Sequence, residues 1–171
     1  MKKQTAMHHL ILEKLSILFN AEKQLVNYLQ VIKNKCQNPA LQSLLNVMIE
    51  VSFSRISRLN QIFVNLKRQP QGATCEAMNG LIRENLSLLS LNNDRRAKEL
   101  TIVSFLHQQN HYKFTAYTWL QAHIYEVPQL MQAGSLIQNI LHEESSMGNQ
   151  ITEVENNLLF LAHFREQLMS F

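Results

Sequence analysis

The sequence predicts an all-α protein, a four-helix bundle with a short extra helix in its one long crossover. Three observations predict this class. Apolar residues recur every three or four positions over long stretches, as on the buried face of a helix. Only four Gly and three Pro interrupt the 171 residues, so the helices can be long. No stretch of the sequence combines strict alternation with the β-branched residues typical of strands.

The first half of the chain predicts two long helices. Residues 7–35 keep the three-and-four apolar spacing throughout, which predicts the first of them. Asn38 is placed to cap the next helix, and Pro39 fits its first turn. The second helix is therefore expected over residues 39–66, again with one apolar stripe.

The second half predicts a short helix and two more long ones. Residues 74–91 carry a shorter helical pattern, and the Asn and Asp side chains at 92–94 can cap the helix that follows. That helix is expected over residues 95–126, because Pro128 disfavours its continuation. The last helix is expected to begin at Gln129 or Ser135 and to end at residue 168.

The lengths of the links predict the topology. The links at 36–39 and 127–129 are short, so the helices that they join must be antiparallel neighbours. About 25 residues separate the second and third long helices, which is enough for a crossover. One long crossover is typical of a ferritin-like bundle rather than a simple up-down-up-down bundle.

The composition excludes several classes of function. Charged residues make up 17% of the chain against roughly 25% in average proteins, and Asn and Gln occur sixteen times each. The net charge is +3 and the basic residues form no run, so we expect no nucleic-acid partner. No apolar stretch approaches the roughly 20 residues that cross a bilayer, so we expect a cytoplasmic protein without a membrane segment. The length favours a single domain over residues 1–171.

Glu22 is the first residue that carries a chemical signal. It lies four residues after Leu18 and three before Leu25, so helical geometry places its carboxylate on the apolar stripe. In ferritin-like bundles such a carboxylate binds a metal pair. The alternative is that helix rotation brings Glu22 to the edge of the bundle, where it is solvated or paired with a lysine.

Four strings, in order, resemble the bacterial YciE/YciF family of ferritin-like proteins. The most specific string is TCEAMNGLI, because generic bundle packing does not require it. The strings are NAEKQL at residues 20–25, RLNQIF at 58–63, TCEAMNGLI at 74–82, and His-Tyr at 111–112 with Ala-Tyr at 116–117. The resemblance covers roughly residues 10 to 160.

The resemblance implies a dimetal site with ligands on all four long helices. The first helix supplies a Glu, the second a Glu and a His three residues later, the third an ExxE pair, and the fourth a Glu. Glu22 matches the first ligand. On the second helix, Glu50 stands where the family has its Glu, and Phe53 stands where it has its His, with Arg55 on the apolar stripe nearby.

The other two helices depart further from the family pattern. Asn110 and Lys113 occupy the positions of the ExxE pair, so both carboxylates are lost. The last helix retains Glu143 and Glu144, one of which matches the final ligand, and Gly148 stands where an Asp often follows. The resemblance therefore implies a degenerate metal site.

Lys113 suggests what replaces the metals. Three Glu with an ammonium among them would bind two hard metal ions poorly. We expect the Lys113 ammonium to lie among Glu22, Glu50 and Glu144 and to supply the positive charge that metals supply in relatives. The alternative is that helix rotation turns Lys113 to solvent and leaves a single weak metal site.

Two functions of different classes follow. The first is a non-catalytic ferritin-like bundle, an interaction or structural protein that needs no cofactor. The family resemblance implies a stress-linked bacterial setting for it. The second is a residual iron or manganese protein with oxidase or peroxidase chemistry on Glu22, Glu50 and Glu144. A DNA-associated mini-ferritin is a third possibility, against which the lack of a basic tail argues. A sparsely charged bundle also has few features that oppose self-association, so we expect a homodimer.

Overall fold

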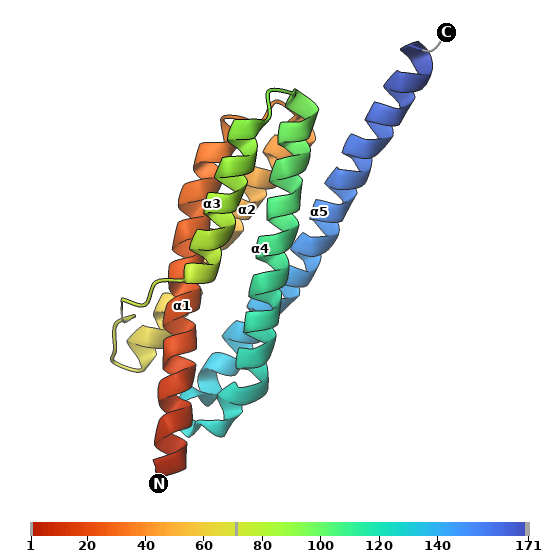
Figure 1. The fold of residues 1–171 in the computed structure, drawn as a ribbon. Coiled ribbons are helices and arrows are strands. Elements are labelled where there is room, and N and C mark those ends of the chain that lie inside the picture. Colours follow the sequence, from red (N-terminus) through yellow and green to blue (C-terminus); the bar gives the residue numbers. More distant parts are fainter. Residues whose placement is uncertain (1, 71, 170–171) are drawn as a thin grey trace.

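The computed structural model describes the backbone of residues 2–70 and 72–169 and the side chains of residues 6–70 and 72–160. The described residues form helices and connecting turns, with no strand, which confirms the all-α prediction (Figure 1). The five α-helices are α1 (Lys2–Lys33), α2 (Pro39–Asn65), α3 (Glu76–Leu91), α4 (Arg95–His123) and α5 (Gly134–Met169). Two short 3₁₀ helices, η1 (Ile124–Glu126) and η2 (Pro128–Ala133), join α4 to α5.

The predicted caps set two of the helix starts. The Asn38 side-chain oxygen accepts a hydrogen bond from the Leu41 N–H at 3.0 Å, and Pro39 is the first residue of α2. The Asp94 carboxylate accepts from the Ala97 N–H at 2.7 Å and caps α4. Both caps satisfy N–H groups that a helix start leaves without a backbone partner.

Two helix ends have a distinct local geometry. α4 ends at His123, three residues early, because the chain tightens into 3₁₀ turns before Pro128. After α2, Lys67 adopts a left-handed backbone conformation with φ of 53°, and the Arg68 N–H donates to the Phe63 carbonyl at 2.9 Å. This is the closing bond of a Schellman motif, usually made with Gly in the left-handed position.

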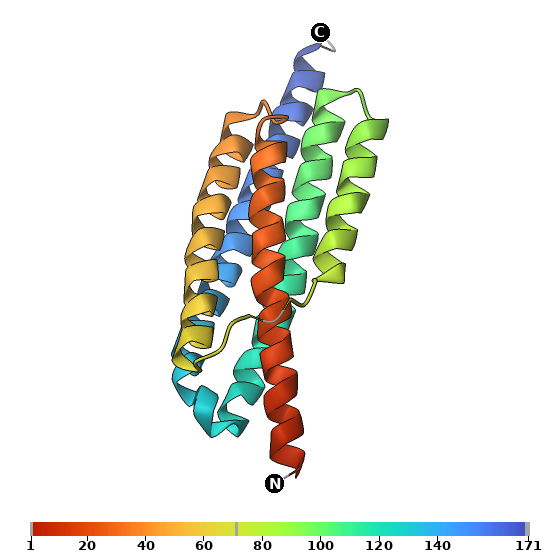
Figure 2. The ribbon, with the colours of Figure 1, turned by 90° about the vertical axis from the view of Figure 1, so that its left-hand side faces the viewer.

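The four long helices form the bundle and α3 packs outside it. α1 packs along α2, α4 along α5, and the contacts of α2 with α5 and of α1 with α4 complete the bundle. α3 lies in the crossover between α2 and α4 and packs against α4 and α1 (Figure 2). This is the connectivity of a ferritin-like bundle, as the link lengths predict.

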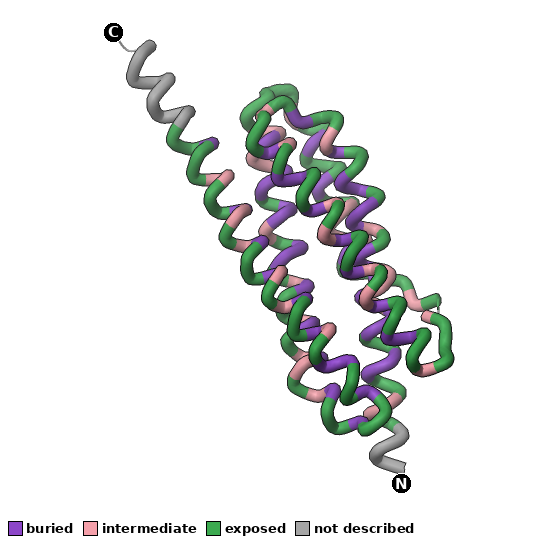
Figure 3. The backbone as a smooth tube through the Cα atoms, turned by 180° about the vertical axis from the view of Figure 1, so that it is seen from behind, coloured by how far each residue is buried: buried purple, intermediate pink, exposed green. Residues whose placement is uncertain are grey.

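The bundle interior contains two separate apolar clusters. Buried and exposed residues alternate along the helices of the bundle (Figure 3). The first cluster occupies the half of the bundle that holds α3, with Leu25, Leu29, Met48, Leu106 and Met147 among its members. The second occupies the other half, with Leu18, Leu59, Tyr117, Leu120 and Ile140 among its members. Among the described helices, none has the length and apolar content needed to span a membrane.

Candidate functional site

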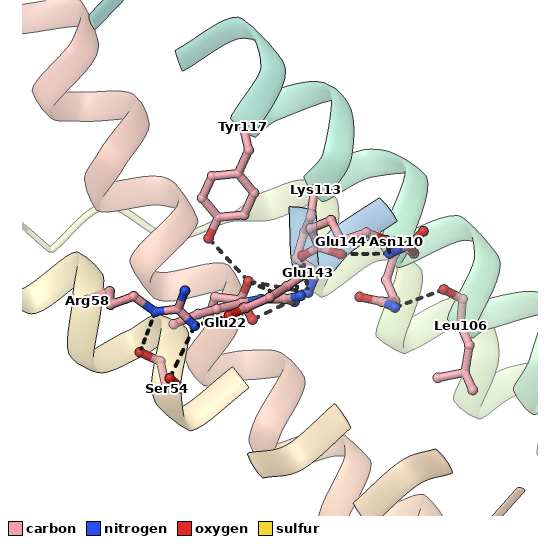
Figure 4. A network of polar contacts seen from close by, with 11 residues as sticks. Glu22, Ser54, Arg58, Leu106, Asn110, Lys113, Tyr117, Glu143 and Glu144 are labelled. Carbon is pink, nitrogen blue, oxygen red and sulfur yellow. Dashed lines mark hydrogen bonds and ion pairs between the residues drawn. The ribbon is translucent and has the colours of Figure 1, made fainter. Parts of the chain in front are cut away.

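Four charged side chains, one from each bundle helix, form a layer between the two apolar clusters. They are Glu22 on α1, Arg55 on α2, Lys113 on α4 and Glu144 on α5, and each is at most 2% exposed. On every helix the charged residue follows a member of one cluster and precedes a member of the other. We call these four residues the charged layer (Figure 4 shows its surroundings).

Lys113 lies between the two carboxylates of this layer. Its Nζ is 2.9 Å from Glu144 Oε1, and it is 3.3 and 3.4 Å from the two carboxylate oxygens of Glu22. The ammonium therefore bridges α1 and α5 from α4. The structure places it inside the bundle, and not in solvent as the alternative interpretation of the sequence would have it.

Arg55 is the second cation of the layer and was not among the site residues predicted from the sequence. Its Nη1 is 2.7 Å from Glu144 Oε1 and 3.9 Å from Glu22 Oε1. Its Nε donates to Glu143 Oε2 at 3.1 Å, and Glu143 also accepts from Arg58 Nη2 at 2.6 Å. Glu143 is 34% exposed, so the network extends from the buried layer to the surface between α2 and α5.

Neutral side chains complete the coordination of the carboxylates. Asn110 Nδ2 donates to Glu144 Oε2 at 2.7 Å and to the Glu144 carbonyl at 3.0 Å. The Tyr117 hydroxyl donates to Glu22 Oε1 at 3.2 Å. A Cβ on Gly148 would lie 3.0 Å from Asn110 Oδ1, so the glycine leaves room for this amide against α5.

The charged layer is electrically balanced, with two carboxylates and two cations. Burial raises the pKa of the Glu144 carboxyl above its ordinary value, although Lys113 and Arg55 oppose this rise. Burial lowers the pKa of the Arg55 guanidinium, but the charges of Glu144 and Glu22 outweigh that effect and keep the pKa raised. Burial, aided by the same two carboxylates, raises the pKa of Tyr117, so its hydroxyl keeps the proton that it donates to Glu22.

Two residues predicted to belong to the site lie elsewhere. Glu50 is exposed, so the prediction that it lies beside Lys113 is wrong, and Phe53 is 52% exposed. The reason is rotational, because a step of two residues turns a helical side chain by about 200°. Glu50 lies two positions from the buried Met48 and Ser52, and Phe53 lies two positions from the buried Arg55. At the level of the charged layer, the two buried residues of α2 that lie three positions apart are Ser52 and Arg55. The Glu-x-x-His pair of the family therefore corresponds to these two positions.

The residues present do not fit a dimetal centre. The carboxylates of Glu22 and Glu144 already contact the Lys113 ammonium and the Arg55 guanidinium. The buried residues at the ligand positions contain no acid and no histidine on α2 (Ser52 and Arg55) or on α4 (Asn110 and Lys113). Among the described residues, no group of three or more His, Cys, Asp or Glu side chains is arranged to hold a metal ion. Hard di- and trivalent ions need several anionic oxygens, and here cations compete for them.

The specific sequence strings have a separate structural role. The Asn20 side-chain oxygen accepts from the Cys75 N–H at 2.8 Å, and Gln24 Nε2 donates to the Cys75 carbonyl at 3.2 Å. Cys75 Sγ lies 3.1 Å from the Tyr112 hydroxyl. Residues from three of the four strings therefore meet where α3 begins, and they fix that helix against α1 and α4.

Arg55 gave a detectable signal in the sequence. It lies four residues before Leu59 and seven after Met48, on the same helical stripe as these buried residues. A cation there calls for a buried anion. Tyr117 gave a weaker signal, four residues after Lys113, because a tyrosine on an apolar stripe is commonly an ordinary core residue.

The fold and the charged layer define a ferritin-like four-helix bundle whose centre holds the side-chain cations of Lys113 and Arg55. Residues 6–159 match the model of a family that is described as a domain of unknown function (DUF892). The chain belongs to this family. It is 24% identical over 148 residues to protein YciF of Escherichia coli K12, a match that covers 84% of this chain and 86% of that protein.

Two solved structures share the fold. YcfI from Rhodopseudomonas palustris, for which a structural role has been suggested, has a TM-score of 0.81 and 26% identity, and the match covers 85% of this chain and 92% of that one. The E. coli stress protein YciF has a TM-score of 0.83 and 21% identity, with 90% and 96% covered. These similarities support the assignment to the YciE/YciF type of bundle.

Proposed function

We propose that this protein is a non-catalytic member of its family, an interaction or structural protein in which a buried ion-pair layer replaces a dimetal centre. One observation carries the proposal. The Lys113 ammonium, 0% exposed, lies within 3.3 Å of carboxylates from both α1 and α5. Arg55 contacts the same two carboxylates from α2.

The layer performs the mechanical task of a metal pair without its chemistry. Metal ions at this place would draw together ligands from four helices and neutralise their charge. Lys113 and Arg55 link the same four helices and balance the two acids. Neither cation changes oxidation state or activates oxygen, so we propose that the protein has no oxidase or peroxidase activity.

The residual-metal alternative has less support. Of its three ligands, Glu22 and Glu144 are in the layer, whereas Glu50 is exposed on α2. A metal ion would have to displace Lys113 or Arg55 from carboxylates that they contact at 2.7 to 3.3 Å. Releasing a buried charge from its partner is costly.

The biological setting is proposed from the relatives alone. One relative with this fold is described as a stress protein, and for another a structural role has been suggested. We propose that this protein acts in the same bacterial stress setting, through contacts with other macromolecules.

The test is metal analysis of protein purified without chelator and without nickel resin. We expect close to zero iron and manganese. The matched control is the Ser52→Glu, Arg55→His, Asn110→Glu, Lys113→Glu variant, which places acids and a histidine at the four inward positions and should gain metal. About two equivalents of iron or manganese per chain in the parent, as a dimetal site holds, would overturn the proposal.

A further inference from the structure

One end of the bundle carries a net positive charge. The loop between α1 and α2 and the loop between α3 and α4 lie together at this end (Figure 2). They are joined by a hydrogen bond from the Asn38 N–H to Glu99 Oε1 at 2.9 Å. Residues 33–38 and 94–99 therefore form one surface, which we call the basic end.

The basic end accounts for the whole net charge of the chain. Its sequence contains five cations, Lys33, Lys35, Arg95, Arg96 and Lys98, and two acids, Asp94 and Glu99, which sum to +3. The formal net charge of the chain is also +3, so all other residues together are neutral. The basic end as a whole is therefore positively charged.

The helix dipole favours Lys33, which lies in the last turn of α1, but it does not explain the three cations of α4. Arg95, Arg96 and Lys98 lie in the first turn of α4, which contains no acidic residue. The start of a helix carries partial positive charge, so cations there are unfavourable. Asp94 caps the helix, and the Glu99 carboxylate accepts from the Asn38 N–H and lies 3.3 Å from Arg95 Nε.

Exposed leucines lie next to the basic end. Leu91, the last residue of α3, is 76% exposed, more than any other large apolar side chain in the described part of the chain. Leu88, one turn earlier, is 42% exposed. Leu91 precedes Arg95 by four residues, across the loop that caps α4. The surface thus combines cations with unburied leucines.

We propose that the basic end, with Leu88 and Leu91, is a docking surface for an acidic, amphipathic segment of another protein. Carboxylates of the segment would pair with the lysines and arginines, and its apolar side chains would cover the leucines. This inference rests on the proposed function as an interaction protein and names the chemistry of the partner. A nucleic acid fits less well, because Asp94 and Glu99 repel phosphates and DNA offers little apolar surface to the leucines.

The probe is a fluorescent synthetic peptide of about five helical turns, made of Glu, Leu and Ala with Leu at three-and-four spacing. We expect measurable binding by fluorescence anisotropy at low salt and weaker binding at high salt. The comparison probes are the same peptide with Lys for Glu, a poly-Glu peptide of equal length, and duplex DNA. Each of them should bind more weakly than the Glu–Leu peptide.

Matched variants test the surface. Leu91→Ser should weaken binding about tenfold, since a leucine contact is lost, whereas Val64→Ser, at the other end of α2 and 61% exposed, should not. Lys35→Gln with Lys98→Gln should weaken binding about fivefold at low salt, whereas Lys14→Gln with Lys67→Gln should not. Circular dichroism would verify that all variants remain folded.

Several outcomes would overturn the inference: no binding of the Glu–Leu peptide, equal binding of the Lys peptide, tighter binding of DNA, or equal effects of the control variants. These outcomes are separate from the metal content, on which the proposed function depends. If the protein is free of metal and does not bind the peptide, only this inference is refuted. If the protein contains the metal and binds the peptide at the basic end, only the proposed non-catalytic function is refuted.

Discussion

Removing the Lys113 ammonium should strongly destabilise the bundle. Lys113→Met keeps most of the side-chain volume and deletes the charge, which leaves the carboxylates of Glu22 and Glu144 with Arg55 as the one cation of the layer. Breaking a buried ion pair by removing one partner costs roughly 3 to 5 kcal/mol. We expect about 3 kcal/mol, the lower end, because Arg55 Nη1 stays 2.7 Å from Glu144 and 3.9 Å from Glu22.

The loss should depend on pH in a defined direction. Burial already raises the pKa of Glu144 in the folded state, and removal of Lys113 takes away a charge that opposes this rise. Between the ordinary carboxyl pKa of about 4.3 in the unfolded chain and the raised pKa in the folded variant, only the folded variant holds the Glu144 proton. Its stability therefore falls as the pH rises through the folded pKa and recovers on acidification below it. The stability deficit relative to the parent should therefore narrow as the pH is lowered from neutrality.

Chemical denaturation at a series of pH values measures this effect. In a separate thermal melt, the same loss of about 3 kcal/mol should lower the melting temperature by roughly 6 to 12 °C for a chain of this size. Lys14→Met, an exposed substitution on α1, is the control and should stay within about 0.5 kcal/mol of the parent.

A second substitution separates charge from packing. In the Lys113→Met, Glu144→Gln double variant the layer is neutral again, because Glu22 pairs with Arg55, and more than half of the lost stability should return. If Lys113→Met costs less than about 0.5 kcal/mol, or if its deficit is the same at every pH, the reasoning about the charged layer is refuted.

Three further predictions concern other parts of the molecule. Glu50→Gln and Phe53→Ser should each change the unfolding free energy by less than about 0.5 kcal/mol, because both residues are exposed; a larger loss would return them to the site. Asn38→Ala should cost about 1 kcal/mol in chemical denaturation, since it deletes the α2 cap, and an unchanged midpoint would contradict that role. Light scattering should give a homodimer, about twice the 19.9 kDa of one chain, because exposed apolar residues such as Phe53 and Phe114 can be covered by a second copy; the mass of a single chain would exclude it.

The fold was predictable because its determinants are local and periodic. The three-and-four spacing of apolar residues, the caps at Asn38 and Asp94, and the two short links specify the helices and their antiparallel pairing without reference to distant residues. The end of α4 was placed three residues too late, because the tightening of a helix into 3₁₀ turns depends on how the connection to α5 packs.

Part of the site could also be predicted from the sequence. Glu22 lies on an apolar stripe, and the family resemblance places Lys113 at a ligand position of the third long helix, so each had to meet an opposite charge or leave the core. The choice between Glu143 and Glu144 remained open, and the structure shows that they differ in role. Glu144 is buried in the charged layer, whereas Glu143 joins Arg55 and Arg58 nearer the surface.

The position of α2 in the site was decided only by the tertiary structure. The sequence placed the Glu22 carboxylate on a buried stripe, where it needs a cation as partner. It does not show how far each helix is rotated about its axis. That rotation follows from packing against three neighbours, and a shift of two residues turns a side chain by about 200°. Packing therefore turns Arg55 and Ser52 inward and Glu50 and Phe53 outward, because the buried face of α2 is the one that fills the space between the other helices.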